Sequence, residues 1–528
     1  MPNYLSPGVY VEEVEAGSRP IEGVGTAVAA FVGFAGNGPF NQPTLVSNWR
    51  QFTSLFGDFI EGAYLAHAVY GYFSNGGGAA YIVRVGQDGA GTGAGDSKSK
   101  QDKPAIAGPR QAELGGYRIT ELESGDKGDA SKSDISIEIA AASSAEGEAT
   151  VPGDLFKLVV KRGRKVEETF DRVSTNRGAN NVITTVQQRS KLIGIEEIGA
   201  TPTPAKPQAG TVALGPPPTA PAAPARMAPD DYVGDVGERT GFSGLAAVDE
   251  VTMVAVPDLM SAYERGAIGL DGVQAVQKEI ITHCELMGDR VAILDPPPGH
   301  GPQQIKEWLR EEANYDSKYA SLYWPWISVF DPVTSTNKFV PPSGHIAGIW
   351  ARNDDTRGVH KAPANEVIRG AIDLQTRLTK AEHDLLNPIG INCIRTFPGR
   401  GIRVWGARTI SSDPAWRYLN VRRLFNYLEK SIMNGTDWVV FEPNDDALWA
   451  RIRRTISAFL VNEWRKGALF GLTPDEAFYV KCDRETNPAE GIDIGQVVCE
   501  IGIAPVKPAE FVIFRLAQFS GGTSLVNE

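Results

Sequence analysis

The sequence contains little cysteine, and it lacks the spacings on which cysteine-based sites depend. Its 528 residues include four cysteines, Cys284, Cys393, Cys482 and Cys499, and no two of them form a Cys-x-x-Cys pair. Zinc sites and dithiol redox motifs usually need such close pairs. The six histidines show no His-Glu-x-x-His motif and no close pairing with cysteine. We therefore interpret the cysteines as reduced core residues and predict no metal ion or other cofactor.

The sequence also lacks any apolar run that approaches the roughly 20 residues of a membrane-spanning helix. Residues 1–10 contain Pro7 and Gly8 but no basic cluster and no apolar stretch, so they do not resemble an export signal. We therefore expect cytoplasmic assembly without direct membrane insertion. Apolar residues make up 42% of the chain and charged residues 22%, which is typical of a soluble protein, and the length predicts two or more compact units.

Positive charge is scarce over most of the chain. The formal net charge is −12, which argues against nucleic acid as a partner of the whole surface. Residues 351–470 are the exception, because they contain 19 basic and 13 acidic residues. This stretch therefore carries +6, and the rest of the chain carries −18.

Hydrophobic patterns in two separate parts of the chain predict a mixed sheet with packed helices, a fold of the mixed α/β or α+β class. Apolar runs of strand length alternate with helical spacing, and Gly or Asn residues end several of the segments. The expected strands are Ala27–Phe34, Ala80–Val85, Val251–Val256, Arg290–Leu294 and Tyr319–Phe330, with helices after Ser47, near Leu65–Phe73 and over Asp271–Met287.

The stretch between Gly86 and Gly244 has a different composition. It begins with a run rich in Gly, Ser, Lys and Asp, and residues 201–230 contain nine prolines. Between these linkers, Asp134–Ala140, Leu155–Lys161 and Lys165–Phe170 are expected to form strands. We predict a small β-rich domain that interrupts the main domain in the sequence.

The last third of the chain predicts a hairpin followed by two long helices. Ile391–Phe397 and Ile402–Thr409 flank a Pro-Gly-Arg-Gly turn. One helix is expected to open at Asp413 with Pro414 in its first turn, and a second to be capped by Asn444. Trp438–Phe441 is expected to be a strand.

Two aspartates and a histidine are the best candidates for catalysis. Asp258 and Asp295 follow expected strands, where α/β enzymes often place carboxylates. An Asp beside Pro more often forms a turn or a helix cap, and we favour that interpretation. Ser343 and His345 lack a Gly-x-Ser-x-Gly elbow. A hydrolase-like α/β enzyme using Asp258, Asp295 and His345 therefore remains an alternative, as does a self-assembling shell or surface-layer protein.

A series of ordered motifs resembles the contractile sheath proteins of phage tails and phage tail-like injection systems. The motifs are spread over both ends and most of the chain except Gly86–Gly244. They are YLSPGVYVEE (Tyr4–Glu13), NGGGAAYIVRV (Asn75–Val85), VPPSGHIAG (Val340–Gly348), RGVHKAPAN (Arg357–Asn365), VWGART (Val404–Thr409), VRRLF (Val421–Phe425), VFEPN (Val440–Asn444), GIAP (Gly502–Pro505) and AEFV (Ala509–Val512).

The resemblance implies a structural subunit with no catalytic residue, rather than an enzyme. It implies sixfold rings of this chain, stacked as a helix around an inner tube protein and completed by baseplate and terminator or cap proteins. The particle would be a phage tail, or a tail-like particle that can be released from the cell. The implied parts are an N-terminal arm (1–20), a middle domain (21–86 and 245–350), an inserted peripheral domain (87–244), a C-terminal inner domain facing the tube (351–508) and a C-terminal arm (509–528).

Two sets of residues are candidates for contacts in such an assembly. Extended segments at the two ends have no obvious local partner, so they are expected to pair with the sheets of neighbouring copies. The basic residues of the last long helix are expected to face an acidic tube. The strand candidates are Val9, Tyr10, Val11, Val14, Phe511, Val512, Ile513, Phe514 and Leu516, within Val9–Val14 and Phe511–Phe519, and the tube-facing candidates are Arg451, Arg454, Arg465 and Lys466.

Overall fold

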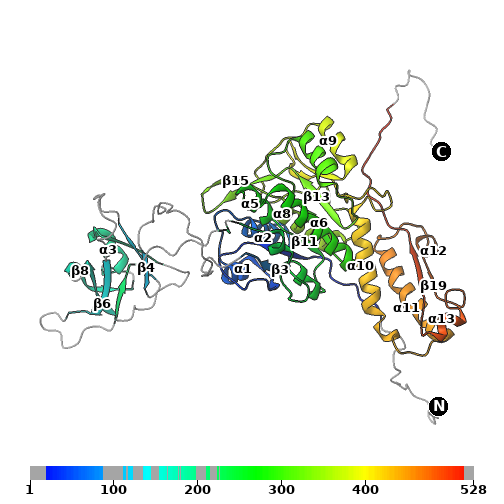
Figure 1. The fold of residues 1–528 in the computed structure, drawn as a ribbon, viewed down its shortest axis with the longest axis horizontal. Coiled ribbons are helices and arrows are strands. Elements are labelled where there is room, and N and C mark those ends of the chain that lie inside the picture. The colour runs from blue at the N-terminus through cyan, green and yellow to red at the C-terminus, as the bar shows by residue number, and fades with distance from the viewer. Residues whose placement is uncertain are drawn as a thin grey trace, which may run out of the picture. The chain divides into compact units, whose positions relative to one another are not determined.

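The chain folds into two compact units, seen in Figure 1. The main unit combines Met1–Gly91 with Ala222–Glu528, and the inserted unit is Thr92–Pro221. The computed structural model describes residues 20–86, 111–114, 117–122, 135–143, 154–162, 165–176, 178, 180–197, 210–214, 223–224 and 226–516. The strand expected at Val9–Val14 and the last residues of Phe511–Phe519 lie outside these ranges.

An eight-stranded sheet forms the centre of the main unit. Its six inner strands are parallel, and each edge strand is antiparallel to its neighbour. The inner strands are almost continuously apolar, as expected where both faces of a sheet are covered. In spatial order the strands are β18 (Gly401–Val404), β17 (Ile391–Phe397), β13 (Ala320–Trp324), β12 (Val291–Leu294), β11 (Met253–Ala255), β1 (Val28–Gly33), β3 (Ala79–Arg84) and β2 (Thr44–Val46).

Segments from before and after the inserted unit build this one sheet. Ala29 of β1 lies opposite Ala80 of β3 on one side and opposite Met253 of β11 on the other. Gly86 and Pro224 lie next to each other, because a Cβ on Gly86 would be 2.8 Å from the Pro224 ring. The chain therefore leaves and re-enters the main unit at one place.

Helices of the main unit pack closely against one another as well as on the sheet. In α8, Gly344 allows the tightest approach, because a Cβ there would lie 2.3 Å from the Ala68 Cα of α2. Gly348, one turn later, would meet the Tyr72 carbonyl at 2.4 Å. The helices are α1 (Trp49–Phe56), α2 (Leu65–Asn75), α4 (Pro229–Val233), η1 (Ser243–Ala247), α5 (Asp258–Glu264), α6 (Leu270–Met287), α7 (Pro302–Glu307), η2 (Trp308–Ala313), α8 (Ser343–Arg357), α9 (Lys380–Leu386) and η3 (Asn387–Ile389).

The aromatic run expected to be one strand forms two strands in different sheets. Residues Ala320–Trp324 are β13 of the large sheet, whereas β14 (Ile327–Asp331) pairs with β15 (Thr336–Val340) and β16 (Asp373–Leu374). Pro325 separates them, and it has no N–H with which to continue a ladder. The prediction of a single strand over Tyr319–Phe330 was therefore wrong.

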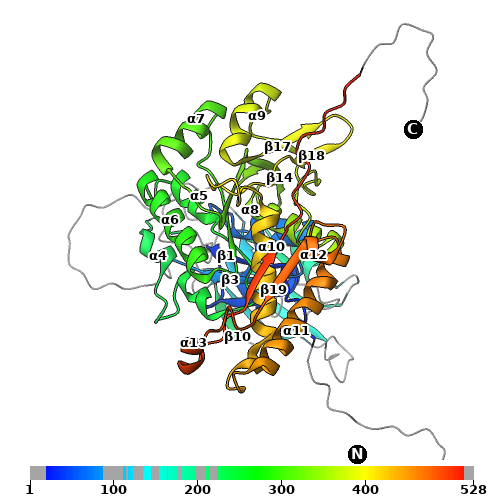
Figure 2. The ribbon, with the colours of Figure 1, turned by 90° about the vertical axis from the view of Figure 1, so that its right-hand side faces the viewer.

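The C-terminal part of the main unit is a helical layer beside a small sheet, facing the viewer in Figure 2. Leu424 and Leu428 of α10 share one apolar core with Ile452, Ile456 and Phe459 of α11. The elements are α10 (Leu419–Gly435), η4 (Asp437–Val439), α11 (Asp446–Arg465), α12 (Pro474–Ala477), β19 (Phe478–Lys481), α13 (Ala489–Asp493) and β20 (Glu500–Ile503).

Three local predictions in this part were wrong. Asp413 forms a turn, accepting a hydrogen bond from the Ala415 N–H, so α10 begins later than expected. The expected strand Trp438–Phe441 begins with a 3-10 turn. The cap of α11 is Asp445, one residue after the expected Asn444, whose side chain accepts a hydrogen bond from Trp449 instead. Similarly, Asn48 rather than Ser47 caps α1.

The inserted unit has its own sheets and its own apolar core. Side chains of β6 alternate between buried and half-buried, as in a strand with one face inward. The core includes Ile137, Phe156, Val160, Val186 and Ile195. One sheet has the order β10 (Gly210–Ala213), β6 (Ile135–Ala141), β7 (Leu155–Arg162) and β8 (Lys165–Ser174); the other is β4 (Gln111–Leu114), β5 (Tyr117–Glu121) and β9 (Ile193–Glu197), with α3 (Val182–Arg189).

Separate cores and adjacent exit points predict that the inserted unit can be removed. Replacing residues 92–221 with a short Gly/Ser linker should leave the main unit folded, because the two ends already lie side by side and loop closure costs little. Circular dichroism and thermal unfolding of the shortened chain would measure this. A transition that is lost, or an insoluble product, would show that the main unit depends on the insertion.

Candidate assembly surface

Asp258, one of the candidate catalytic residues, caps a helix from inside the core. It is fully buried at the end of β11, and its carboxylate accepts hydrogen bonds from the backbone N–H groups of Phe34 (2.6 Å), Leu65 (3.3 Å) and Tyr64. The last two begin α2, where N–H groups lack partners within the helix. Burial raises the pKa of Asp258 to about 6, against these hydrogen bonds, which lower it.

Asp295 has the same role at the start of α8. Its carboxylate accepts the Ser343 backbone N–H at 3.0 Å and also the Ser343 hydroxyl. Burial raises the pKa of Asp295 to about 7. His345 instead packs against Gly71 of α2, and burial lowers its pKa to about 4. Both aspartates cap helices, but each caps a helix from elsewhere in the chain, whereas a turn or helix beside its own proline was expected. The Ser343 hydroxyl donates its hydrogen bond to Asp295.

The raised pKa of Asp295 predicts a stability that falls with pH. The unfolded chain loses this proton near pH 4 and the folded chain only near pH 7. Between these two values, each rise in pH therefore lowers the free energy of unfolding. Relative to wild type, Asp295→Asn should gain stability as the pH rises from 4.5 to 8, by up to about 4 kcal/mol. Urea unfolding across this range measures the difference.

Buried histidines, whose pKa values are lowered, make the protein more stable as the pH rises. Wild type and Asp295→Asn contain the same histidines, so this effect cancels in the difference between them. The exposed Asp384→Asn on α9 serves as the control and should show no such trend. Identical pH slopes for Asp295→Asn and wild type would contradict the assignment.

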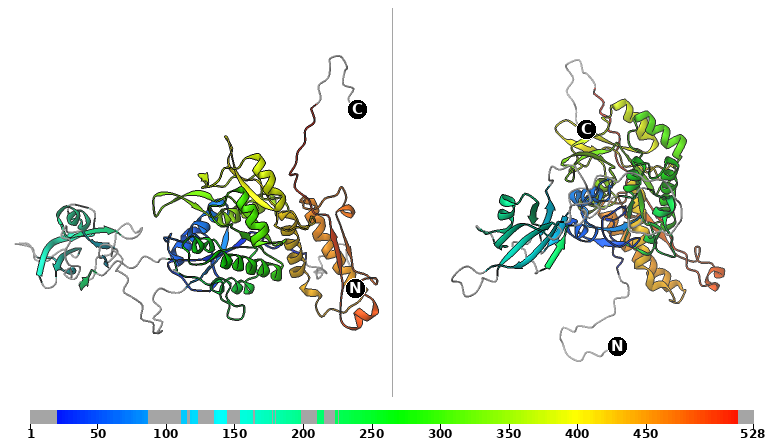
Figure 3. Two further views of the ribbon diagram at one scale, coloured as in Figure 1. Left: turned by 45° about the horizontal axis from the view of Figure 1, so that its top comes forward. Right: turned by 60° about the vertical axis from the view of Figure 1, so that its left-hand side comes forward.

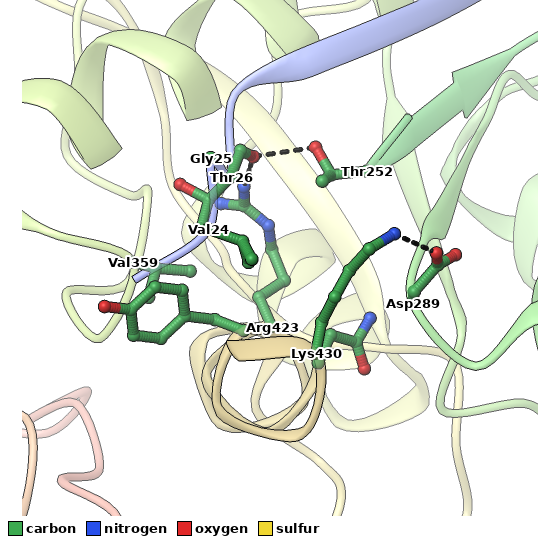
Figure 4. A pocket seen from close by; sticks show the side chains of 10 residues that line it. Val24, Gly25, Thr26, Thr252, Asp289, Val359, Arg423 and Lys430 are labelled. Atoms are coloured by element: carbon green, nitrogen blue, oxygen red, sulfur yellow. Dashed lines mark hydrogen bonds and ion pairs between the residues drawn. The ribbon is translucent and has the colours of Figure 1, made fainter. Parts of the chain in front are cut away.

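The root of the N-terminal arm, residues 21–26, is bound along α10 (Figure 4). A Cβ on Gly435 would be 2.6 Å from Ile21, and one on Gly23 would be 2.1 Å from the Tyr427 hydroxyl. The Val24 N–H donates to the Ser431 hydroxyl at 3.1 Å. Contact of this closeness leaves room for glycine only, so the root follows one fixed path over the helix.

Arg423 of α10 ties this root to the rest of the main unit. It donates to the Thr26 carbonyl at 3.0 Å and forms two hydrogen bonds to the Asp354 carboxylate, at 2.9 and 2.6 Å. Both members of the ion pair are 3% exposed. Lys430, about two turns further along the same side of α10, pairs with Asp289 at 2.5 Å. The cavity between these residues measures only about 20 Å³, which is room for a single water molecule.

The root of the C-terminal arm is bound at the other end of α10. The buried Asn420 side chain donates to the Val506 carbonyl at 3.0 Å. Further along, Glu510 forms a two-pronged ion pair with Arg408, which is 7% exposed. Beyond this pair, residues 511–516 are exposed and form neither helix nor strand. One helix therefore holds the roots of both arms, and Figure 3 shows the dark red C-terminal root extending away from the main unit.

The small sheet beside α11 has two strands among the described residues. Phe478 lies opposite Ile503 and Lys481 opposite Glu500 in an antiparallel pair. Tyr479 is 60% exposed. A sheet of two strands is marginal alone and presents unpaired backbone groups along its outer edges, which another strand can join.

The four tube-facing candidates do not form one free basic surface. Arg451 pairs with Glu442 at 2.6 Å and lies over the Trp438 ring, and Lys466 pairs with Glu463 at 2.7 Å. Arg454 and Arg465 are exposed. They are eleven residues apart, about three helical turns, and so lie on the same face of α11.

No helix in the described part of the chain is long and apolar enough to cross a membrane. Within the same residues, no group of three or more His, Cys, Asp or Glu side chains is arranged to hold a metal ion.

Comparison with known families decides the identity of this fold. Residues 247–410 match the central domain of phage tail sheath proteins, and residues 411–519 match their C-terminal domain. Together the two matches cover more than half of the chain. The chain belongs to the phage tail sheath family. Members of this family are structural components of tails, not enzymes.

Individual sheath proteins are similar over about half of this chain. The tail sheath protein of Vibrio phage KVP40 is 28% identical over 292 residues, 53% of this chain and 41% of the relative. A putative prophage major tail sheath protein of Pseudomonas aeruginosa is 27% identical over 296 residues, 54% of this chain and 70% of the relative. The chain thus spans less than half the length of the KVP40 sheath.

Solved sheath structures share the fold over nearly the whole chain. The contracted sheath of the extracellular contractile injection system PVC has a TM-score of 0.57 at 22% identity, covering 98% of this chain and 99% of that one. The contracted helical sheath of the anti-feeding prophage has a TM-score of 0.57 at 24% identity, with 97% and 99% covered. The predicted mixed α/β sheath fold is confirmed.

Sequence reasoning did not identify the residues that hold the arm roots. Arg408, Asn420, Arg423 and Glu510 were not candidates, although three of them lie in the motifs VWGART, VRRLF and AEFV that carry the family resemblance. A charged residue inside an otherwise apolar motif was the available signal, but its partner lies too far along the chain to be read from the pattern.

Proposed function

We propose that this chain is the subunit of a contractile sheath, polymerised as stacked sixfold rings around an inner tube. Contraction of the sheath drives the tube through a target envelope. The observation that carries the proposal is the attachment of both arm roots to one helix, α10, beside a two-stranded sheet with open edges. Membership of the sheath family and likeness to contracted sheaths support it.

The terminal arms link neighbouring copies in this proposal. Val9–Val14 and Phe511–Phe519 add as strands to the β19–β20 sheets of other subunits, which satisfies backbone groups on both sides. The exposed apolar side chains of residues 511–516 would be covered by this pairing, because Phe514 is 85% and Leu516 98% exposed in the single chain. Tension on the N-terminal arm then passes into α10, whereas tension on the C-terminal arm passes first to Arg408 through Glu510 and then to α10 through Asn420.

The other partners are an inner tube protein and the baseplate and terminator proteins of the particle. Assembly takes place in the cytoplasm, and the particle is a phage tail or a tail-like particle that can be released. The inserted unit lies on the outer surface, away from the ring contacts. The shortened chain that lacks residues 92–221 should therefore still form cylinders.

Removal of the N-terminal arm should separate folding from assembly. Deleting residues 1–16 keeps the bound root at 21–26, so thermal unfolding should not change. The truncated chain should stay monomeric, because no strand is left to join the next subunit. Negative-stain microscopy and sedimentation measure this outcome.

Two point variants sharpen the test of the arm. Val11→Pro removes one backbone N–H from the expected strand and should reduce cylinder yield, whereas Val11→Ile retains the strand pattern and should not. Normal cylinders from the truncated chain would refute the proposed linkage.

The exposed arginines of α11 are proposed to face the tube. Arg454 and Arg465 test this better than Arg451, because reversal of Arg451 would also place an acid beside Glu442. Each exposed ion pair stabilises a contact by about 0.2–1 kcal/mol. Because the same pair recurs in every subunit of the rings, the total stabilisation of the sheath on the tube is larger. Arg454→Glu with Arg465→Glu should leave folding and contracted cylinders intact but abolish extended, tube-filled sheaths in electron micrographs.

The matched control reverses two exposed charges on the inserted unit, Arg162→Glu and Arg189→Glu, which change the net charge by the same amount. Extended particles should form normally from this control. Equal yields from both double variants at raised salt would exclude this face of α11 from the tube contact.

A further inference from the structure

Two of the four cysteines face each other at the end of the β19–β20 sheet. The last residue pair of this sheet is Lys481 opposite Glu500, so Cys482 and Cys499 are the next facing positions. The two thiols are close enough to affect each other, because Cys482 raises the pKa of Cys499 and Cys499 lowers that of Cys482. Facing residues of antiparallel strands have Cα atoms about 4.5–5.5 Å apart. A disulfide needs about 4.4–6.8 Å, and two residues that face each other one step beyond this ladder fall within that range.

The surroundings of the pair are unequal in a way that suits stepwise oxidation. Cys482 is fully buried, and the Asn487 side chain lies 3.8 Å from its sulfur. Cys499 is partly exposed. The Arg453 guanidinium donates to the Cys482 carbonyl and stabilises the thiolate forms of both residues. Reagents in solution therefore reach Cys499 first, and Cys482 is the buried thiol that can resolve a mixed disulfide.

The other two cysteines have no such arrangement. Cys284 lies on α6 and Cys393 on β17, both buried in the core of the large sheet. They fit the prediction of reduced core residues, and they provide internal controls for the first pair.

We propose that Cys482 and Cys499 form a disulfide within the chain when it meets a small-molecule disulfide such as oxidised glutathione. The Cys499 thiolate attacks one sulfur of the oxidant, forms a mixed disulfide and releases one thiolate. The Cys482 thiolate then attacks the Cys499 sulfur, closes the protein disulfide and releases the second thiolate. Two protein thiols lose two protons and two electrons, and the oxidant is reduced to two thiols.

Burial limits the rate of this exchange without preventing it. Loss of solvent raises the pKa of Cys499 to about 12, so only a small fraction is thiolate at neutral pH. The pair thus stays reduced in a reducing cytoplasm and oxidises slowly in an oxidising medium.

The disulfide would close a loop over residues 483–498 and join the two strands at one end of their sheet. This consequence rests on the proposed function, in which the same sheet receives the arms of neighbouring copies: the bond would hold the accepting edge together under tension. The formation of the bond itself does not depend on that function.

The test counts thiols in the full-length chain after incubation with oxidised glutathione and then denaturation. Titratable thiols should fall from four to two per chain, and peptide mass spectrometry should find Cys482 linked to Cys499. Cys482→Ser and Cys499→Ser should each block the linkage. Cys284→Ser, the matched control, should fall from three thiols to one.

Four thiols remaining in the wild type, glutathione bound to Cys499 without closure, or linkage between separate chains would each overturn the proposal. The outcome is independent of the proposed function, because the chain lacking residues 1–16 retains both cysteines. That variant can lose cylinder formation while its thiols oxidise normally, or the reverse.

Discussion

The buried ion pair between Arg423 and Asp354 joins parts of this sheath subunit that are distant in sequence. Arg423 belongs to α10 and Asp354 to α8, and the same guanidinium holds the Thr26 carbonyl of the N-terminal root. It also lies over the Trp350 ring, 4.8 Å from its centre. Loss of one partner would leave the other charge buried and unpaired, which typically costs about 3–5 kcal/mol. The position of the arm root relative to the large sheet depends on this contact.

Attachment of both roots to α10 fits the proposed assembly, in which a subunit would move while its arms stay bound to neighbouring copies. A helix is stiff along its axis because its backbone hydrogen bonds lie in that direction. Force that enters at residues 21–26 would meet Ser431 and Arg423. Force that enters from the C-terminal arm would meet the Glu510–Arg408 pair first and then Asn420. The glycines at 23 and 435 let the root lie directly on the helix, so little slack separates the arm from the body.

Two buried aspartates of the main unit cap helices and are not arranged for catalysis. Asp258 and Asp295 follow neighbouring parallel strands, and each satisfies the first N–H groups of a helix that comes from elsewhere in the chain. In the amino-acid sequence alone, carboxylates that follow strands cannot be distinguished from catalytic ones. Their burial and their backbone partners distinguish them, because a carboxylate that caps a helix has its oxygens occupied.

The sequence by itself determined the class of fold, most of the elements and the family. Continuous apolar runs such as Val28–Gly33 and helical spacing such as that of Leu270–Met287 are local patterns, and local patterns suffice to define strands and helices. Cys482 and Cys499, 17 residues apart, were interpreted as reduced core residues because they form no Cys-x-x-Cys pair.

Only the tertiary structure decided which of these elements touch. Pro325, which has no N–H, divides one apolar run between two sheets. The Asp445 side chain, and not that of its neighbour, accepts the capping hydrogen bond from the Leu448 N–H. Arg423 contacts Asp354, Glu510 contacts Arg408 and Cys482 lies near Cys499 only in the folded chain, because packing of the elements brings these side chains together. Contacts of this kind follow from the positions of whole elements. The partners are 69 residues apart for Arg423 and Asp354 and 102 for Arg408 and Glu510, and even the two cysteines, 17 residues apart, are brought together by the pairing of β19 with β20.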